Sequence, residues 1–481
     1  MASGLWRCSR APGCCLPALL ALAALASPHG RLGAAAAEGS GGKWHEVSVS
    51  SLLPGAVCTA TEAAPNSSTL TVVHRHGPCS PLRSSRGGPR SHAEILRRDR
   101  ERVDAINHKL HGATAASKGG AADVTLQARW GKPLGSSNYF ISVGLGTPAR
   151  RLSVEFDTGS VQSWVQCTPC AECYQQHDPL FDPDKSSTYS AVSCGAHECR
   201  EFGSQSQNCS SESDSPCRYE VSYGDDSRTT GKLARDTLAL TPATTIRGFM
   251  FGCGHKDAGI FGEVDGLFGL GRGKASLSSQ AEATAFSYCL PSSPSSVGYL
   301  TLGAAAAAAP ANAQFTAMVA GPDESLYYLN LTGINVAGRP IEVSPAAFAA
   351  AAGTIIDSGT AFSRLPPSAY AALRSAFRRA MGKRYRRAPA PAPFDTCYDL
   401  AGHDTVRVPS VALVFGDGTA VELDPSGVLY AWEDVPQLCL AFAPNPDEES
   451  VGVLGNTQQR TLTVVYDVGN MRIGFGAKGC A

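Results

Sequence analysis

A duplicated motif is the feature that most constrains how this chain can fold. The sequence reads Asp-Thr-Gly-Ser at residues 157–160 and Asp-Ser-Gly-Thr at residues 357–360, and an apolar run precedes each copy. An element with the pattern apolar-apolar-Gly follows each copy, within 266–273 and within 451–459. One such tetrapeptide arises easily by chance, but two copies in matched surroundings indicate an internal duplication. The sequence therefore predicts two related lobes, each carrying one aspartate.

The two aspartates, Asp157 and Asp357, suggest a specific chemistry. If the lobes bring both carboxylates within hydrogen-bond reach, they cannot both ionise easily, so the pair holds one proton. The ionised oxygen could then take a proton from a water molecule while the protonated oxygen donates to a substrate carbonyl, which leads to amide hydrolysis. This chemistry needs no metal and no cofactor.

Six neighbours are candidates for supporting the pair. The hydroxyl after each aspartate could link the two loops, and the glycine allows a tight turn that brings amide N–H groups to the carboxylate. The second hydroxyl could fix the outer carboxylate oxygen. These residues are, in that order, Thr158 and Ser358, Gly159 and Gly359, and Ser160 and Thr360.

Composition sets the general class of the protein. The chain has 481 residues, of which 43% are hydrophobic and 17% charged, and its formal net charge is -1. These values are typical of a globular protein and give no overall field toward nucleic acid or an anionic membrane. The many glycines and prolines favour an all-β protein with frequent turns.

The first residues have the pattern of a targeting sequence. Arg7 and Arg10 precede an apolar run at 14–26, which is typical of a secretory signal and too short to span a membrane. The first acidic residue is Glu38, so a chloroplast transit peptide is the alternative. We favour a signal peptide over residues 1–26 and an extracellular, apoplastic protein, and no other segment has the length and apolarity of a membrane span.

The cysteines agree with secretion. Of 17 cysteines, an even set runs from Cys167 to Cys480, which is typical of disulfides formed in an oxidising compartment. The Cys-x2-Cys-x2-Cys run at 167–173 resembles part of an iron–sulfur motif, but the further ligands of a cluster or zinc site do not follow. Three Asn-x-Ser/Thr triplets are candidate glycosylation sites: Asn66, Asn208 and Asn330.

The region before the β-rich body has a different character. Residues 91–111 are charged with helical periodicity, and the Gly/Ala/Ser-rich stretch 112–122 reads as a flexible linker. This arrangement predicts a prosegment over 27–121 that is removed by cleavage. The alternative is a surface helix of the mature protein.

Further patterns divide the remaining chain. Two alternating runs that meet at 146–148 predict a β-hairpin, and a helical pattern covers 366–387. The low-complexity stretch 304–314 marks the join between the halves. We therefore expect an N-terminal lobe over 122–310 and a C-terminal lobe over 311–481.

Longer stretches make a family resemblance plain. "TVVHRHGPCS", "FDTGS", "YGDDSRTTG", "GLFGLGRG", "IIDSGTAFSRLPPSAYAALRSAF" and "GNTQQRTLTVVYDVGNMRIGFGAKGC" are similar to segments of pepsin-type aspartic proteases, and the similarity runs from residue 70 to the end. The chain most resembles their plant nepenthesin-like branch, which includes a chloroplast-nucleoid DNA-binding protease and apoplastic enzymes.

The resemblance implies a fold and a function. The fold would be all-β and bilobal with short helices, and the activity that of an aspartic endopeptidase of peptidase family A1, made as a zymogen. Asp157 and Asp357 would be catalytic. Tyr223 would be the flap tyrosine, and Trp164 would be its packing and hydrogen-bonding partner. Protein or peptide substrates, pepstatin-type inhibitors and a monomeric state follow from the same resemblance.

The resemblance also implies six disulfides, a connectivity that the sequence alone leaves open. They are Cys167–Cys170, Cys173–Cys253, Cys194–Cys217, Cys199–Cys209, Cys289–Cys480 and Cys397–Cys439.

Two alternative functions remain open at this point. One is a catalytically silent family member that binds proteins through its cleft. The other is a DNA-binding plastid protein, suggested by a basic run that could contact phosphates and that is otherwise a solvated helix with cations near its end. The run comprises Arg374, Arg378, Arg379, Lys383, Arg384, Arg386 and Arg387. We regard nucleic acid as the less favoured partner.

Overall fold

The computed structural model of the chain describes residues 43–53, 57–59, 69–81, 92–117, 139–202, 215–222, 227–259, 261, 263–308, 310–348, 353–431 and 437–480. The expected signal peptide, Tyr223, Asn66, Asn208 and Cys209 lie outside these residues. In this part of the chain, none of the helices is both long and apolar enough to cross a membrane.

The N-terminal segment contributes four elements: β1 (Trp44–Ser48), α1 (Val49–Leu52), β2 (Thr69–His74) and α2 (His92–Ser117). The helix expected at 91–111 is present. The prediction of a linker from residue 112 is wrong for residues 112–117, which continue α2. Alanines in this stretch favour the helix enough to extend it past the glycine.

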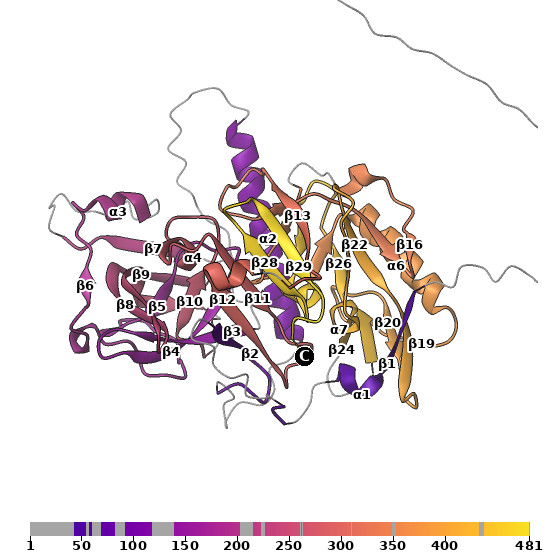
Figure 1. The fold of residues 1–481 in the computed structure, drawn as a ribbon, viewed down its shortest axis with the longest axis horizontal. Helices are drawn as coiled ribbons and strands as arrows, with labels where there is room; N and C mark the ends of the chain where they lie inside the picture. The colour runs from indigo at the N-terminus through magenta and orange to yellow at the C-terminus, as the bar shows by residue number, and fades with distance from the viewer. Residues whose placement is uncertain are drawn as a thin grey trace, which may run out of the picture. The chain divides into compact units, whose positions relative to one another are not determined.

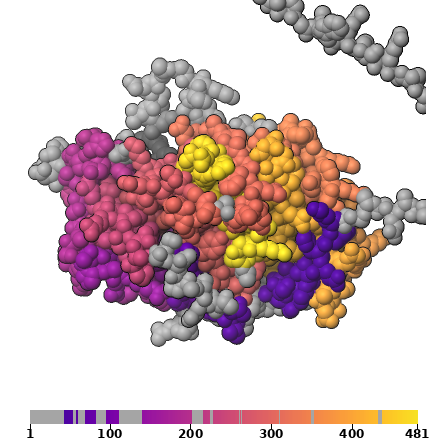
Figure 2. All heavy atoms as spheres, viewed as in Figure 1, coloured from indigo at the N-terminus to yellow at the C-terminus, as the bar shows by residue number. Residues whose placement is uncertain are grey.

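Two strands of this segment join sheets of the later chain. β1 pairs antiparallel with β21 (Thr405–Pro409), and Figure 2 shows these indigo residues against the orange residues of the second half. β2 pairs with both β3 (Tyr139–Leu145) and β12 (Val297–Leu302), so it is an interior strand of its sheet. The segment is thus part of the folded body.

The first half of the body is almost entirely β-structure. Besides β3 and β12 its elements are β4 (Arg150–Asp157), β5 (Trp164–Gln166), η1 (Pro183–Lys185), β6 (Ser190–Ala191), α3 (His197–Phe202), β7 (Arg218–Ser222), β8 (Arg228–Thr241), β9 (Thr244–Ala258), β10 (Gly266–Gly269), α4 (Leu277–Gln280), β11 (Ala285–Cys289) and α5 (Ala304–Ala307).

The second half is also rich in strands. Its elements before residue 400 are β13 (Gln314–Val319), β14 (Tyr328–Leu329), β15 (Leu331–Val336), β16 (Arg339–Pro340), η2 (Pro345–Phe348), β17 (Thr354–Ile356), β18 (Ser363–Leu365), α6 (Pro367–Met381), β19 (Arg386–Ala388) and β20 (Cys397–Asp399). After β21 follow β22 (Val411–Phe415), β23 (Ala420–Glu422), α7 (Pro425–Val428), β24 (Leu429–Ala431), β25 (Gln437–Leu440), β26 (Phe442–Pro444), β27 (Gly452–Leu454), η3 (Asn456–Gln459), β28 (Thr463–Asp467) and β29 (Arg472–Gly476).

The duplication seen in the sequence is also present in the strand pairing. β4, which ends at Asp157, runs parallel to β10, and β17, which precedes Asp357, runs parallel to β27. β10 and β27 are the two apolar-glycine elements that follow each motif. Each aspartate therefore leaves a strand that is paired in the same way in both halves.

Two local predictions can be compared with the backbone. The hairpin is present, since β3 and β4 pair antiparallel and Gly146 turns with a φ of 90°. The helix expected over 366–387 is shorter, because α6 ends at Met381 and the next residue, Gly382, has a φ of 61°, which suits glycine after a helix end. Residues 386–388 form β19 instead, so Arg386 and Arg387 lie on a strand beyond the helix.

One apolar core spans both halves. It includes Phe156, Phe286, Ile356 and Tyr466, and the rings of Phe286 and Tyr466 stack with centroids 4.4 Å apart. β28 of the second half pairs with β11 of the first, so backbone hydrogen bonds also join the halves. This shared core and sheet provide a rigid base for the loops that carry the two aspartates.

Four of the six expected disulfide pairings differ from those in the structure. Cys167 bonds Cys253, and Cys170 bonds Cys173, so the expected Cys167–Cys170 and Cys173–Cys253 pairings are wrong. Cys199 bonds Cys217, which makes Cys199–Cys209 and Cys194–Cys217 wrong as well. Strand register explains the first case, since β5 and β9 are paired beside Cys167 and Cys253.

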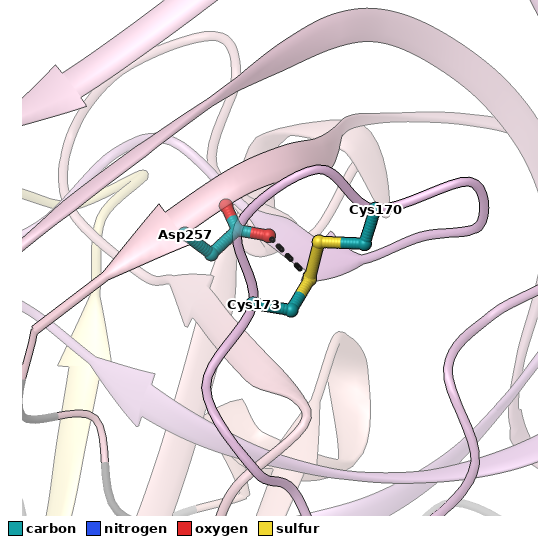
Figure 3. A group of neighbouring side chains, drawn as sticks. All are labelled: Cys170, Cys173 and Asp257. Atoms are coloured by element: carbon teal, nitrogen blue, oxygen red, sulfur yellow. Dashed lines mark hydrogen bonds between the residues drawn. A yellow bond between two sulfur atoms is a disulfide. The ribbon is translucent and has the colours of Figure 1, made fainter.

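The other bridges agree with expectation or add to it. Cys289–Cys480 and Cys397–Cys439 are both present, and Cys58–Cys79 adds a bridge within the N-terminal segment. Cys170 and Cys173 lie beside Asp257, whose Oδ2 is 3.7 Å from Sγ of Cys173 (Figure 3). Because their sulfurs are joined to each other, these cysteines are not thiolates of the kind that bind metals.

The length of the closed loop predicts which bridge stabilises more. Cys289–Cys480 closes a span of 191 residues and Cys170–Cys173 a span of 3. Chain entropy then predicts that a Cys289→Ala/Cys480→Ala chain loses about 5 kcal/mol of unfolding free energy, and a Cys170→Ala/Cys173→Ala chain only about 1–2 kcal/mol. Urea unfolding of both chains under oxidising conditions measures the difference. Equal losses would contradict the entropic explanation.

Candidate active site

The two Asp-Gly loops meet at the centre of the fold. The amide of Thr158 donates to Oγ of Ser358 at 3.0 Å, and the amide of Ser358 donates to Oγ1 of Thr158 at 2.9 Å. Each loop therefore fixes the other through a symmetric pair of hydrogen bonds. Both aspartates are fully buried. The linking role predicted for the Thr158 and Ser358 hydroxyls agrees with these contacts.

Each aspartate is oriented by its own loop. The amides of Gly159 and Gly359 each donate to Oδ1 of the preceding aspartate at 3.0 Å. Oγ1 of Thr360 donates to Oδ2 of Asp357 at 2.5 Å, and Oγ of Ser160 donates to Oδ2 of Asp157. These contacts hold the two carboxylates in matched orientations and leave their facing edges for another group.

The two glycines are required by close approach. A Cβ atom at Gly359 would lie 2.2 Å from Oδ1 of Asp157, and one at Gly159 would lie 2.7 Å from Oδ1 of Asp357. Any side chain at these positions would collide with the opposite carboxylate. Glycine therefore lets the two carboxylates approach each other.

A residue of the N-terminal segment lies between the carboxylates. Nη2 of Arg102, from α2, donates to Oδ1 of Asp157 and to Oδ1 of Asp357, both at 2.7 Å. Its Nε donates to Oδ2 of Asp357 at 2.8 Å. Arg102 is 2% exposed, so this guanidinium occupies the space between the two carboxylates and excludes solvent.

The electrostatics of the two aspartates differ. Burial raises the pKa of Asp157, and Arg102 offsets this effect only in part. Burial acts in the same direction on Asp357, but Arg102 and the hydrogen bonds from Thr360 and Gly359 outweigh it, so its pKa lies below the ordinary value. An arginine that contacts both carboxylates favours their charged forms.

Other residues of α2 also contact the second half. Ile106 and Leu110 pack against apolar side chains that include Leu326 and Val453. The amide of Val451 donates to Oδ1 of Asn107 at 2.7 Å. Figure 1 shows α2 passing between strands of the two halves, and these contacts place it across the carboxylate pair.

The expected flap can be assessed only in part, because Tyr223 lies outside the described residues. Trp164 is fully buried on β5, where its ring lies 4.8 Å from that of Phe261. Its position beside the first loop is compatible with the expected supporting role. That role stays a prediction, as does glycosylation of Asn330, which is exposed.

The basic run is partly neutralised. Nη1 of Arg374 donates to Oδ2 of Asp395 at 2.6 Å, and Nη2 of Arg378 donates to the Asp395 carbonyl at 2.8 Å. Arg387 also donates to this carbonyl, at 2.9 Å. These arginines organise the chain around Asp395, which reduces the charge available to a phosphate backbone.

Sequence reasoning missed Arg102 as a site residue. It stands in "RRDRERV", where several arginines look equivalent. The signal was available in the helical period, since Arg102 and Asp99 share a face with Leu96, Val103 and Ile106. Charged residues on the apolar face of a helix require buried partners, and here these are the two carboxylates and Arg364.

Comparison with known proteins identifies the fold and the family. Two family models match, the xylanase inhibitor N-terminal domain over residues 139–304 and the xylanase inhibitor C-terminal domain over 326–477. Solved structures of basic 7S globulin from soybean and conglutin gamma from lupine seeds each align with a TM-score of 0.56, at 22% and 21% identity. Each alignment covers 72% of this chain, with 94% of the soybean and 93% of the lupine chain. At such identity the likeness concerns the fold, which is the expected all-β, bilobal one.

Relatives of higher identity cover most of the chain. An aspartyl protease family protein of Arabidopsis thaliana is 43% identical over 91% of this chain and 93% of its own length. The aspartyl protease AED1 of the same plant is also 43% identical, over 91% of this chain and 92% of its own length. Nepenthesin-1 of Nepenthes gracilis, an aspartic proteinase, is 33% identical over 72% of this chain and 79% of its own length. The chain therefore belongs to the plant, nepenthesin-like branch of the pepsin-type aspartyl proteases.

Proposed function

We propose that this protein is an aspartic endopeptidase of peptidase family A1 that is made as a latent zymogen and held inactive by Arg102. The observation that carries the proposal is the contact of one buried guanidinium with both carboxylates at 2.7 Å. The names of the relatives support proteolysis, and the paired loops supply the residues that it needs. Proteins or peptides are the substrates, and they can reach the two carboxylates once Arg102 has left.

The mechanism follows from the geometry of the pair. Once Arg102 leaves, Asp157 and Asp357 face each other across the space that it filled, and their repulsion favours a shared proton. The ionised carboxylate takes a proton from the attacking water, while the protonated one donates to the scissile carbonyl. The proton then passes to the leaving nitrogen as the C–N bond breaks. The hydrogen bonds from Gly159 and Gly359 keep both carboxylates oriented during these steps.

Latency follows from the fit of the N-terminal segment, which we interpret as the prosegment. It adds β1 to one sheet and β2 to another, and α2 covers the carboxylates. Arg75, just after β2, forms a buried ion pair with Glu155 of β4. Removal of the segment must therefore break backbone pairing as well as ion pairs, which favours proteolytic release over simple dissociation.

Acid weakens the contact of Arg102 in two steps. Arginine stays charged, so the attraction changes only with the carboxylates. The pKa of Asp157 is raised, because burial outweighs the effect of Arg102, so as pH falls this carboxylate loses its charge before Asp357 does. The pKa of Asp357 is lowered, so this carboxylate is fully charged above its ordinary pKa. It keeps its stabilising contact with Arg102 until the pH falls through the lowered value. Activation is therefore expected in acid.

An acid-jump experiment tests the proposal. The purified chain, moved from pH 7 to pH 4, should begin to cleave a denatured protein substrate, and pepstatin should stop the cleavage. The N-terminal segment should be released as activity rises, which gel electrophoresis would record. Cleavage that is equally fast at pH 7 would contradict latency, and cleavage that pepstatin leaves unchanged would contradict the aspartic mechanism.

The cellular location remains a proposal as well. We favour secretion to the apoplast, with a chloroplast location as the alternative. The disulfides support an oxidising compartment. A fluorescent fusion to residues 1–42 would separate the two locations. We retain the monomeric state as an expectation, and DNA binding as a secondary activity that the salt dependence of binding would reveal.

A further inference from the structure

Besides Arg102, α2 places a buried carboxylate, that of Asp99, next to the loop that carries Asp357. The amides of Ala361 and Phe362 donate to its Oδ1 at 2.7 Å and 3.1 Å. Nη2 of Arg364 donates to its Oδ2. Asp99 is fully buried and Arg364 is 3% exposed, so this is an enclosed site for a negative charge.

The site belongs to the enzyme body rather than to α2. Ala361 and Phe362 directly follow Thr360, whose hydroxyl binds Asp357, and Arg364 lies on β18. β18 pairs with β26 and β27, which fixes the backbone that carries the guanidinium. Among the described residues, Nε of Arg364 is a buried donor without a hydrogen-bond partner. The site thus has donor capacity beyond what Asp99 uses.

An apolar cluster adjoins this charge site. Leu96, one helical turn before Asp99, packs in a cluster that contains Phe362, Phe394 and Tyr430. α2 therefore presents an acidic and an apolar side chain to neighbouring parts of the second half. A peptide that replaces α2 across the aspartates would pass over the same two positions.

Departure of α2 leaves the charge site without its anion. A guanidinium and two amides would then lose the acceptor that they share, and donors left without a protein partner favour a ligand that supplies an acceptor. A carboxylate offers two acceptor oxygens and the matching charge, and arginine binds it with high geometric specificity. The group that best replaces Asp99 is therefore another carboxylate.

We propose that Arg364 and the amides of Ala361 and Phe362 form a carboxylate-binding subsite, which holds Asp99 in the latent chain and an acidic side chain of the substrate in the active enzyme. This inference rests on the proposed function, because it assigns a substrate class to the same cleft. The α-carboxylate of a peptide C-terminus has the same chemistry and is the second possible source of the anion.

Matched peptides test the subsite. Quenched fluorescent peptides that differ only by Glu or Gln, with the variable residue scanned through the positions around the cleaved bond, would be given to the acid-activated full chain. The assay runs at pH 5, above the ordinary Glu pKa of about 4.3. At one position we expect kcat/KM to be about 10–100-fold higher for Glu, the size expected for a charge-assisted hydrogen bond. A second pair of peptides, one ending in a free carboxylate and one in an amide, tests whether the α-carboxylate of a peptide C-terminus binds the subsite instead.

Variants of the chain locate the effect. Arg364→Gln should reduce the Glu preference to within about threefold, and Arg364→Lys should retain part of it, because charge remains but the two-pronged geometry is lost. Arg379→Gln, which changes an exposed arginine of α6, should leave the preference intact. If Arg364→Gln does not fold, Arg364→Lys still decides, since an unchanged preference in that chain would overturn the inference.

The outcomes separate this inference from the proposed function. Cleavage of Glu and Gln peptides at equal rates at every position would overturn the subsite and leave the protease intact. A preference only for free C-termini would also overturn the side-chain assignment. If the chain cleaves none of the peptides, the proposed function fails, and binding measured by fluorescence anisotropy decides the subsite. Tighter binding of the Glu peptide, lost in Arg364→Gln, would support it, and equal binding would overturn it.

Discussion

Asp157→Asn or Asp357→Asn will each reduce peptide hydrolysis by about 10³–10⁴-fold or more, down to the background of the assay, in keeping with the usual contribution of a general acid or base. Asparagine has the shape of aspartate, and its Oδ1 can still accept the hydrogen bond from the glycine amide of the loop. It cannot take a proton from water or share one with its partner. The substitution therefore removes the chemistry and preserves the packing.

The measurement is kcat/KM at pH 4 with a quenched fluorescent peptide, together with a thermal melt that checks the fold. Asp417→Asn is the matched control, since Asp417 lies in an exposed turn between β22 and β23 and should leave hydrolysis unchanged. Loss of both aspartates should cost little more than loss of one, because the pair acts as a unit. A folded single variant that keeps a tenth of the activity would show that the pair is not the catalytic group.

The second large effect concerns latency. Arg102→Met should raise hydrolysis at pH 6 by about 100-fold or more over the wild-type chain. Methionine fills much of the same volume but leaves two buried carboxylates without a cation, and breaking a buried ion pair costs about 3–5 kcal/mol. That cost falls only on the closed state, so it shifts the population toward chains whose cleft is open.

Arg97→Met is the control for this prediction. Arg97 lies on the same helix but is exposed and pairs with Glu101 one turn later. Exposed pairs contribute little, so this chain should stay as latent as the wild type. If Arg102→Met also stays latent, the apolar and strand contacts of the N-terminal segment suffice for inhibition, and the role that we assign to Arg102 is wrong.

Part of this structure could be predicted from the sequence, because some signals are local. The two Asp-Gly loops, the hairpin at residue 146 and the start of α6 at a proline follow from short patterns with clear backbone preferences. The pairing of Thr158 with Ser358 follows from the duplication, since two related halves place equivalent hydroxyls face to face. These predictions agree with the structure.

Other features depend on contacts that short patterns do not encode. The pairing of Cys167 with Cys253 depends on the register of β5 beside β9, which are distant in the chain. The length of α2 reflects alanine propensity in a stretch whose glycine suggested a linker. Arg102 could not be singled out among neighbouring arginines until the carboxylates that it contacts were placed.

The role of Arg364 could not be predicted from the local sequence either. The sequence "DSGTAFSRL" marks Asp357 clearly, but nothing local indicates that Arg364 contacts a carboxylate of α2. Its meaning comes from Asp99, which lies far away in the chain and binds both the arginine and the loop amides. A residue of α2 thus points to the ligand that we propose for this site.

The most direct test of the account combines two substitutions in one assay. Hydrolysis of a single peptide at pH 6 would be compared for Arg102→Met and for Arg102→Met/Asp157→Asn. The account predicts an active first chain and an inactive second one, because Arg102 restrains the chemistry of the aspartate pair and nothing else. Equal activity in the two folded chains would contradict it, since the activity released by removing Arg102 would then not come from the pair.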